Sequence, residues 1–289
     1  MNIWIAGARP RTLPAAIAPV LIGSSLINID GREINWVNAL LALGVGLLLQ
    51  IAVNYSNDYS DGIRGTDEAR VGPIRLVASG LKSSRTVKNA AILSYFLAAI
   101  CGLILSLKTS PLLILVGAIA ITAGWKYTGG KKPYGYSGFG EISVFVFFGV
   151  VATMGSYFAQ SQELTWRAFL LSVPMGALSC TILGLNNLRD RPKDEAVGKK
   201  TLAVRLGDAR ARIFLILLLL LAFTTSIAAA VITPWALIVL ATTPFYYLLI
   251  KGITSGAIGT RLIPLLGKAG EVQLLTALLI TFALMITKA

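Results

Sequence analysis

The sequence contains no histidine, and only 13% of its 289 residues are charged. The absence of histidine excludes His-ligated metal sites, Ser-His hydrolases and histidine general bases. A soluble domain of this length carries roughly twice this charged fraction, so the composition also argues against a soluble enzyme. Any chemistry must therefore use carboxylates, amides, tyrosine, lysine or arginine.

Cysteine is also scarce, because the chain has only two. Cys101 and Cys180 both lie within apolar runs, and their spacing is not that of metal ligands. We therefore expect two small buried residues and neither a disulfide nor a metal site.

Apolar residues are abundant, at 55% of the chain, and the mean hydropathy is +0.74. Runs long enough to cross a bilayer, about 17–25 residues each, recur along the whole chain. Nine are predicted, near residues 12–29, 37–56, 87–107, 110–127, 139–160, 167–186, 211–231, 234–250 and 270–287. We expect an all-α polytopic membrane bundle that forms a single domain over residues 1–289. The first run shows no clear cleavage pattern, and we interpret it as a retained helix, not a signal peptide.

Lysine and arginine are distributed unevenly among the connections between these predicted helices. The segment before the first helix and the connections on the same side of the membrane hold 22 of the 26 basic residues. Because basic loops are retained in the cytoplasm, we predict a cytoplasmic N-terminus and an outside C-terminus. This asymmetry explains most of the net charge of +13. The expected partners are thus membrane lipid and anionic substrates, and not nucleic acid.

Acidic residues number only 13, and most of them lie in two predicted cytoplasmic loops, 57–86 and 187–212. Each loop follows an apolar run that ends in polar residues. Desolvated charges at the end of a membrane helix are costly and usually functional. The two loops are therefore the first places to look for a site.

The two acidic stretches open in the same way. Asn54 precedes Asp58 by four residues, and Asn186 precedes Asp190 by four residues. This spacing places both side chains of a pair on one helical face. The two pairs are four predicted helices apart, which indicates a duplicated four-helix unit.

The acids within these stretches have the spacing of oxygen ligands for a hard divalent cation. They are Asp58, Asp61, Asp67, Asp190 and Asp194. Magnesium is usually held by a few carboxylates together with phosphate oxygens and water. The same loops carry many lysines and arginines, which suit the remaining oxygens of a diphosphate. The alternative interpretation is that these charges form ordinary salt bridges in water. The repetition of the pattern favours a metal and phosphate site.

Longer segments carry a resemblance that spans nearly the whole chain. NDYSDGIRGTD (57–67) and NNLRDRPKDEAVGKKTLAVRLG (186–207) resemble the two aspartate-rich motifs of the UbiA-type intramembrane aromatic prenyltransferases. RPRTLPAAIAPVLIG (9–23) and KKPYGYSGFGEISVFVFFG (131–149) are similar to the opening and central segments of the menaquinone branch of that superfamily. The chain is therefore identified as a member of this branch.

One departure from the wider superfamily is informative. Many relatives place the last aspartate of the first motif four residues after Asp61, where this chain has Gly65. Here Asp67 follows six residues after Asp61, a spacing similar to that of the menaquinone branch.

The resemblance implies a fold and an activity. The fold is a bundle of nine transmembrane helices around a central cavity, capped on the cytoplasmic side by loops 57–86 and 187–212. The activity is transfer of a polyprenyl group from an allylic polyprenyl diphosphate to 1,4-dihydroxy-2-naphthoate. Diphosphate and carbon dioxide are lost, and demethylmenaquinone is formed at the cell membrane.

The resemblance also implies a magnesium-dependent reaction with two bound ions. The residues implied for the first ion are Asn54, Asp58, Asp61 and Asp67, and those for the second are Asn187, Asp190 and Asp194. Asn57 and Asn186 are alternatives to the neighbouring asparagines, so the inward-facing member of each pair stays open.

Further residues are candidates for contact with substrate. Tyr127 and Lys131 match a Tyr-x-x-x-Lys element that lies near the diphosphate in the family, although they could also be an interfacial anchor and a topogenic charge. Arg64, Arg70 and Lys199 are additional diphosphate candidates. Glu141 begins an apolar run, where it could bond a substrate hydroxyl or stabilise a helix N-terminus.

Two other functions remain alternatives at this stage. A sister transferase would use another aromatic acceptor, such as 4-hydroxybenzoate or homogentisate. A divalent-cation transporter would place its acids near the bilayer midplane, whereas here they cluster at one predicted membrane face.

Overall fold

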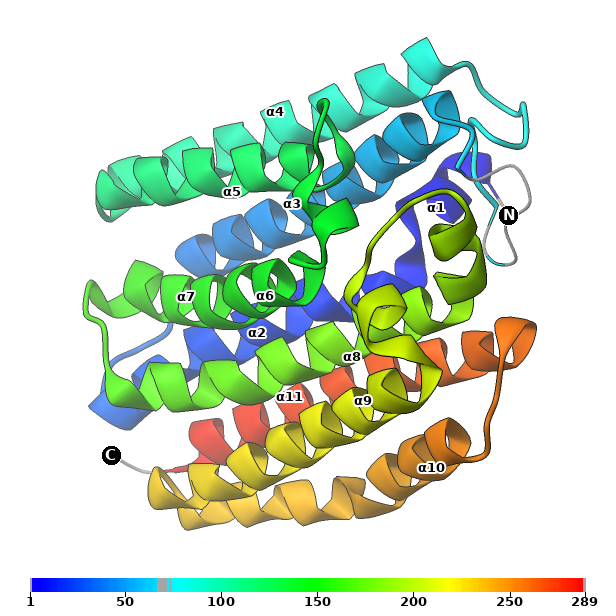
Figure 1. Ribbon diagram of the computed structural model, residues 1–289. Helices are drawn as coiled ribbons and strands as arrows, with labels where there is room; N and C mark the ends of the chain where they lie inside the picture. Colours follow the sequence, from blue (N-terminus) through cyan, green and yellow to red (C-terminus); the bar gives the residue numbers. More distant parts are fainter. Residues whose placement is uncertain (1, 67–71, 73, 288–289) are drawn as a thin grey trace.

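A computed structural model describes residues 2–66, 72 and 74–287 of the chain (Figure 1). Every regular element in these residues is helical. The α-helices are Ile3–Ala8 (α1), Pro14–Ser25 (α2), Trp36–Ile63 (α3), Ser84–Lys108 (α4), Leu112–Thr128 (α5), Gly140–Val144 (α6), Ala152–Ser161 (α7), Trp166–Ala196 (α8), Leu202–Ala228 (α9), Thr243–Thr254 (α10) and Ile263–Ile286 (α11). A π-helical segment, Phe145–Val151, joins α6 to α7, and short 3₁₀ segments such as Tyr134–Ser137 lie between others.

Several long helices begin at a polar residue that caps their first turn. A side-chain oxygen accepts a hydrogen bond from the backbone N–H three residues later, which satisfies a donor that has no partner inside the helix. These capping residues are Asn35 for α3, Ser83 for α4, Thr165 for α8 and Thr201 for α9.

Within the described residues, seven helices are long and apolar enough to cross a membrane. An eighth span results if Ile3–Thr12 and Pro14–Asp30, bent by 53° at their junction, count as one. Leu112–Thr128 is also apolar but has 17 residues, which is about 26 Å at a rise of ~1.5 Å per residue. The nine predicted runs correspond to these elements. The protein is a multi-pass helical membrane protein, while a count of nine crossings stays a prediction.

Two helices continue well beyond the apolar runs that predicted them. α3 ends at Ile63 and α8 at Ala196, although the runs end at residues 56 and 186. The predicted extent of loops 57–86 and 187–212 is therefore wrong. Hydropathy detects residues that suit lipid, whereas the aspartates in these turns are buried inside the protein. The exposed fractions of Asp58 and Asp190 are only 1% and 9%.

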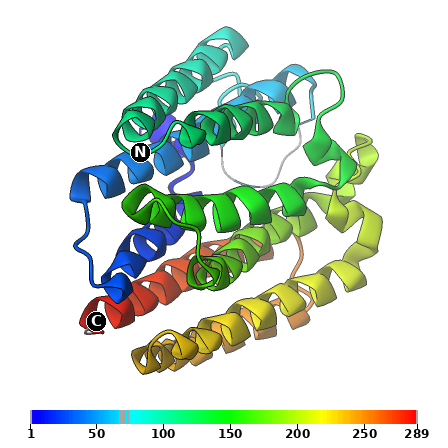
Figure 2. The ribbon, with the colours of Figure 1, turned by 90° about the vertical axis from the view of Figure 1, so that its left-hand side faces the viewer.

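The centre of the bundle is α8, which packs against α9, α11 and the π-helical segment (Figure 1). Two glycines permit the closest of these approaches, because a Cβ added to Gly149 would lie 2.5 Å from Cα of Gly176. α3 packs mainly against α4. The bundle thus has a tightly packed half around α8 and a second layer formed by α3, α4 and α5 (Figure 2).

The C-terminal ends of α3, α5 and α8 lie together on one side of the bundle, close to the start of the described chain (Figure 1). Arg64 at the end of α3 donates to the carbonyl oxygen of Thr128 at the end of α5, at 2.6 Å. The C-terminus lies at the opposite end, where Asn28 donates to the backbone oxygen of Leu284 at 2.9 Å. The polar motifs therefore converge at one end, and the assignment of that end to the cytoplasm stays a prediction.

Candidate active site

A cavity of about 330 Å³ lies between α2, α3, α5, the π-helical segment and α8. Its polar end is lined by Arg9, Asn54, Asn57, Asp61, Arg75, Tyr127, Tyr136, Asn186, Asn187, Asp190, Lys193, Asp194 and Lys199. Its other end is apolar, with Val45, Leu113 and Phe148 among its lining residues. α3 contributes one face of the wall, which changes from apolar at Ala42 to polar at Asp61. The cavity can thus hold a charged group at one end and a hydrocarbon at the other.

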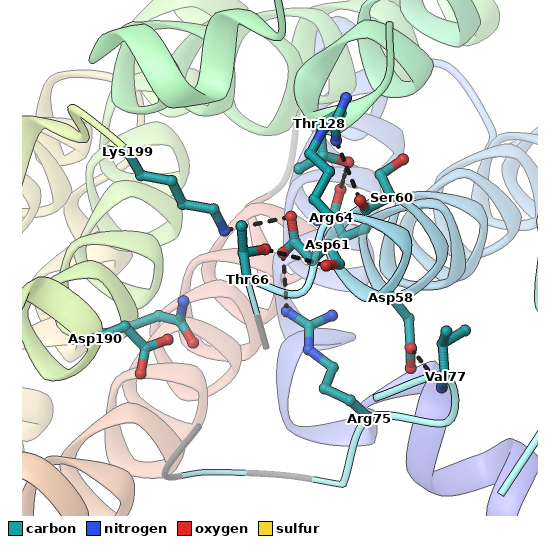
Figure 3. A network of polar contacts seen from close by, with 12 residues as sticks. Asp58, Ser60, Asp61, Arg64, Thr66, Arg75, Val77, Thr128, Asp190 and Lys199 are labelled. Atoms are coloured by element: carbon teal, nitrogen blue, oxygen red, sulfur yellow. Dashed lines mark hydrogen bonds and ion pairs between the residues drawn. The ribbon is translucent and has the colours of Figure 1, made fainter. Parts of the chain in front are cut away.

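Asp61 joins three polar side chains at the polar end. Its carboxylate lies 3.3 Å from Nζ of Lys199 and 3.6 Å from Nη2 of Arg75 (Figure 3). It also accepts a hydrogen bond from the hydroxyl of Tyr136. Burial, together with the charge of Asp61, raises the pKa of Tyr136, so the phenol stays protonated at neutral pH and remains a donor. Nζ of Lys199 also lies 4.0 Å from Oδ1 of Asp194. This lysine therefore links the two acidic motifs.

Asp58 lies on the same helix but is directed toward Val77 instead of toward Lys199 (Figure 3). Its carboxylate accepts hydrogen bonds from the backbone N–H groups of Leu76 at 2.8 Å and Val77 at 3.0 Å. Asp58 is not among the residues that line the cavity. In this structure it anchors the connection that follows α3, and its role as a metal ligand stays a prediction from the resemblance.

Asp190 and Asp194 are one helical turn apart on α8, and both line the cavity. Nε and Nη2 of Arg189 each lie 2.7 Å from an oxygen of Asp190, so the guanidinium binds the carboxylate with two parallel bonds. The connection after α3 also approaches this pair. A Cβ added to Gly72 would lie 3.1 Å from Cζ of Arg189, so a glycine permits this close contact.

One asparagine of each motif has its amide nitrogen held by the protein. Nδ2 of Asn187 donates to Oε1 of Glu141 at 3.0 Å. Nδ2 of Asn54 donates to the carbonyl oxygen of Ala8 at 2.9 Å and to the hydroxyl of Thr12 at 3.2 Å. Both asparagines line the cavity, and these bonds orient each amide. Oδ1 of Asn54 also accepts from Nε2 of Gln50 at 3.5 Å, but an amide oxygen has two lone pairs and can still act as a ligand.

The neighbouring asparagines use their oxygens inside the protein. Oδ1 of Asn57 accepts from the hydroxyl of Thr128 at 2.7 Å, and Oδ1 of Asn186 accepts from Arg189 at 2.7 Å. In the choice that the sequence left open, the geometry of the amides favours Asn54 and Asn187, and their role as metal ligands stays a prediction.

Glu141 is buried beside Asn187, with an exposed fraction of 5%. Oε1 accepts the bond from Asn187, and Oε2 has no hydrogen-bond partner among the described residues. Its backbone oxygen also accepts from the thiol of Cys180 at 3.1 Å. The side chain therefore orients an amide of the cavity wall, while direct contact with a substrate hydroxyl stays a prediction.

Two predicted diphosphate residues lie outside the cavity wall. Arg64 donates to the carbonyl oxygens of Thr128 at 2.6 Å and Gly130 at 2.5 Å, so it holds the end of α5. Lys131 is exposed in the connection after α5 and is not among the lining residues. Contact of either side chain with phosphate stays a prediction.

The remaining predicted residues divide between the wall and the part of the chain that is not described. Tyr127 lines the cavity, and its ring meets that of Tyr134 edge to face, with centroids 5.6 Å apart. Lys199 lines the cavity as predicted. Asp67 and Arg70 lie outside the described residues.

The lining residues that were not predicted include Arg9, Arg75 and Tyr136. Arg9 ends α1 with a φ of 54°, a left-handed conformation that is uncommon for a non-glycine residue and that turns the chain into α2. The segments that resemble the family, RPRTLP and GYSG, contain Arg9 and Tyr136 and could have indicated them. Arg75 follows the acidic motif without a comparable signal.

The polar end suits a hard divalent cation. Its carboxylate and amide side chains offer oxygen atoms as metal ligands, and oxygen is the ligand atom that magnesium prefers. Asn54 and Asn187 offer oriented carbonyl oxygens. Among the described residues, however, no three acidic or cysteine side chains gather into one cluster. The described donor set therefore fits a cation that shares its coordination with phosphate oxygens.

Comparisons with known proteins agree with this geometry. The model of the UbiA prenyltransferase family matches residues 16–262, and the 1,4-dihydroxy-2-naphthoate octaprenyltransferase of Mycobacterium tuberculosis is 49% identical over 281 residues. The chain belongs to the UbiA prenyltransferase family. The match to the M. tuberculosis protein covers 97% of this chain and 96% of that protein. The predicted family is therefore confirmed.

Two further UbiA relatives extend the comparison. An Escherichia coli protein of the same name is 39% identical over 216 residues, which cover 72% of this chain and 70% of that protein. The structure of a UbiA homolog from Archaeoglobus fulgidus bound to GPP and Mg²⁺ matches with a TM-score of 0.71 at 17% identity, covering 98% of this chain and 99% of that one. The second likeness shows the UbiA fold.

Proposed function

We propose that this UbiA-family protein transfers a polyprenyl group from a polyprenyl diphosphate to 1,4-dihydroxy-2-naphthoate, with loss of diphosphate and carbon dioxide. The immediate product is the hydroquinone demethylmenaquinol, which a separate two-electron oxidation converts to demethylmenaquinone. The observation that carries the proposal is that one cavity has carboxylates, amides and basic side chains at one end and an apolar wall at the other. The relatives at 49% and 39% identity carry the name of this activity and support the choice of acceptor.

Basic side chains of the protein bind the diphosphate. Lys199 and Arg75 converge on Asp61 at the polar end, and both can donate charge-assisted hydrogen bonds to phosphate oxygens. A bound divalent cation, with two ions proposed, supplies Lewis-acid stabilisation of the negative charge on the departing diphosphate. The residues proposed to hold it are Asn54, Asp61, Asn187, Asp190 and Asp194, with Asp58 and Asp67 implied by the resemblance.

The apolar wall protects the reacting carbon. When the bond between the allylic carbon and the diphosphate oxygen breaks, the allylic fragment becomes cation-like, and water would trap it. Val45, Leu113 and Phe148 belong to the wall that excludes water there. The electron-rich ring then forms the new carbon–carbon bond at the carbon that bears its carboxylate. The resulting β-keto acid loses carbon dioxide and returns the electron pair to the ring, so no histidine base is needed.

The proposal extends to the membrane. We propose one integral-membrane domain over residues 1–289 with nine crossings. The polar end of the cavity and the N-terminus face the cytoplasm, and the connections between α3 and α4 and between α8 and α9 cap the cavity. A cysteine at Lys132, which is exposed near the polar end, should be labelled only from the cytoplasm, and one at Glu33 only from outside. The reverse pattern would overturn the orientation.

The direct test is mass analysis of the product that purified protein forms from 1,4-dihydroxy-2-naphthoate and an allylic polyprenyl diphosphate. We expect a product mass that shows both prenylation and decarboxylation, loss of turnover with EDTA and recovery with magnesium. 4-Hydroxybenzoate and homogentisate serve as competing acceptors. Faster prenylation of either one would replace the naphthoate as the substrate, and full turnover in metal-free buffer would overturn the metal dependence.

A further inference from the structure

Two glycines in the cavity wall face open space. Of the lining glycines, Gly117 on α5 and Gly155 on α7 are the two at which an added Cβ would meet no described atom within 4 Å. The glycines that line the cavity are Gly46, Gly102, Gly117, Gly124, Gly135 and Gly155.

The other lining glycines have neighbours at that distance. A Cβ added to Gly124 would lie 2.9 Å from the hydroxyl oxygen of Tyr95, so a side chain there would clash. Even at Gly102, which has the most space of these, a Cβ would meet Val45 at 3.7 Å. Close packing therefore accounts for the glycines at which a Cβ would have a neighbour within 3.3 Å, namely Gly46, Gly124 and Gly135, but it does not account for Gly117 and Gly155.

The two glycines belong to two separate walls of the cavity. On α5 the lining residues include Val116, Gly117 and Ala120, and on α7 they include Ala152 and Gly155. Within each set the spacing of three or four residues forms one helical face. α5 and α7 both pack against α3 but not closely against each other (Figures 1 and 2). The cavity thus occupies the space between α5 and α7.

This space is far from the polar end. Thr128, whose hydroxyl bonds Asn57, marks the polar end of α5. Gly117 precedes Thr128 by 11 residues, which is about 16 Å along the helix at ~1.5 Å per residue. Both glycines are half-buried. Beside Gly117, the side chains of Leu115 and Ile119 on α5 are 58% and 51% exposed, so this helix meets lipid next to the glycine. A chain that starts at the polar end and follows the apolar wall therefore reaches Gly117 and Gly155 before it meets lipid.

We propose that Gly117 and Gly155 form a slot through which a long polyprenyl tail leaves the cavity for the bilayer, and that their missing side chains determine which tail lengths react. The inference rests on the proposed prenyl transfer. A short tail ends inside the cavity before the slot, whereas a long tail must pass between the two glycines. Filling the slot should therefore discriminate by tail length and not by the chemistry of the diphosphate.

The test uses Gly117→Leu and Gly155→Leu in the full-length protein, with Gly267→Leu as a matched control. Gly267 also lies within a helix and has open space around an added Cβ, but it does not line the cavity. For each variant, kcat/KM is measured with geranyl diphosphate and with octaprenyl diphosphate at a fixed naphthoate concentration. Size-exclusion elution and thermal midpoint report whether each variant is folded.

We expect both slot variants to lose about 10- to 100-fold in kcat/KM with the octaprenyl substrate, from overpacking along the path of the tail, while geranyl transfer is retained. The control should keep both activities. An equal loss for both substrates, or no loss for the octaprenyl substrate, would overturn the slot while prenyl transfer by the unaltered protein still stood. If the unaltered protein prenylated no acceptor from either diphosphate, the proposed function itself would fail.

Discussion

The two acidic motifs begin with the same spacing of asparagine and aspartate, but the structure uses them differently. On α3, Asp58 turns out of the cavity and binds the backbone N–H groups of Leu76 and Val77. On α8, Asp190 faces the cavity and is bound by its sequence neighbour Arg189. Equal spacing on a helix therefore does not give equal roles to the side chains.

The difference follows from the length of the connection after each helix. The connection from α3 to α4 covers residues 64–83, long enough to fold back so that its N–H groups reach Asp58. The connection from α8 to α9 covers only residues 197–201 and brings Lys199 to the polar end. In the first motif, Asp61 takes the place in the cavity wall that Asp190 and Asp194 hold in the second.

The largest effect should come from Asp61, which contacts cations on two other segments. We expect Asp61→Asn to lower kcat/KM by about 10³-fold, because it removes a negatively charged proposed metal ligand and the charged partner that Lys199 and Arg75 share. Turnover measured beside the thermal midpoint would separate this loss from misfolding. Glu195→Gln is a suitable control, since this glutamate side chain is 64% exposed and pairs only with Arg191 in the described residues. Near-normal turnover of Asp61→Asn would remove it from the site.

In the second motif, Asp190→Asn should cost somewhat less, about 10²-fold in kcat/KM. The substitution weakens a proposed ligand but leaves Asp194 in place, and Asn retains one oxygen to accept from Arg189. Titration of turnover with magnesium should show a higher concentration at half-maximal activity than for the unaltered protein. An unchanged magnesium requirement would show that Asp190 only positions Arg189.

The role of Glu141 should be visible through Asn187. Glu141→Leu removes the acceptor that orients the amide, so we expect a loss of about 10- to 100-fold with a raised magnesium requirement. Glu141→Gln, which keeps an acceptor oxygen, should restore much of the activity. Retention of a low naphthoate KM in both variants would support the orienting role, whereas a raised naphthoate KM would indicate that Glu141 contacts the acceptor.

For Asp58 the expected effect is on stability more than on chemistry. Asn at this position can accept only one of the two backbone bonds, so we expect Asp58→Asn to cost about 1–3 kcal/mol of stability and to lower activity less than Asp61→Asn does. Thermal midpoint and kcat/KM measured on the same preparation test this. A stable protein without turnover would instead support the ligand role that the resemblance implies.

The sequence was a good guide to the spans and a poorer one to the direction of individual side chains. Hydropathy located each span because the faces that contact lipid must be apolar. It ended α3 and α8 too early, because Asp58 and Asp190 are sheltered by protein, which a hydropathy pattern does not reveal. The family motifs indicated Asp61 as a metal ligand and Lys199 as a diphosphate residue; their side chains lie 3.3 Å apart, and the two roles stay predictions.

The direction of Asp58 could not be predicted, because it depends on where residues 74–77 return to the helix. This long-range contact leaves no periodic signal in the sequence. The same reason explains why Arg75 was missed and why Lys131, predicted beside the diphosphate, lies exposed outside the wall.

The smallest effect is expected at Lys131, and Lys199 provides the comparison for it. Lys199 approaches Asp61 at 3.3 Å inside the cavity, whereas Lys131 is exposed. Loss of a charge-assisted hydrogen bond costs about 1.5–3 kcal/mol, or roughly 10- to 150-fold, and we expect Lys199→Ala to raise the KM for the polyprenyl diphosphate within that range. The increase caused by Lys131→Ala should be well below that range, because a solvent-exposed charge is screened by water and salt.

Kinetics at two salt concentrations would separate a direct contact of Lys131 with phosphate from a long-range effect, since a long-range effect should vanish at high salt. If Lys131→Ala instead costs as much as Lys199→Ala at both concentrations, the loop after α5 must close over the bound diphosphate, and the predicted contact of Lys131 with phosphate would stand.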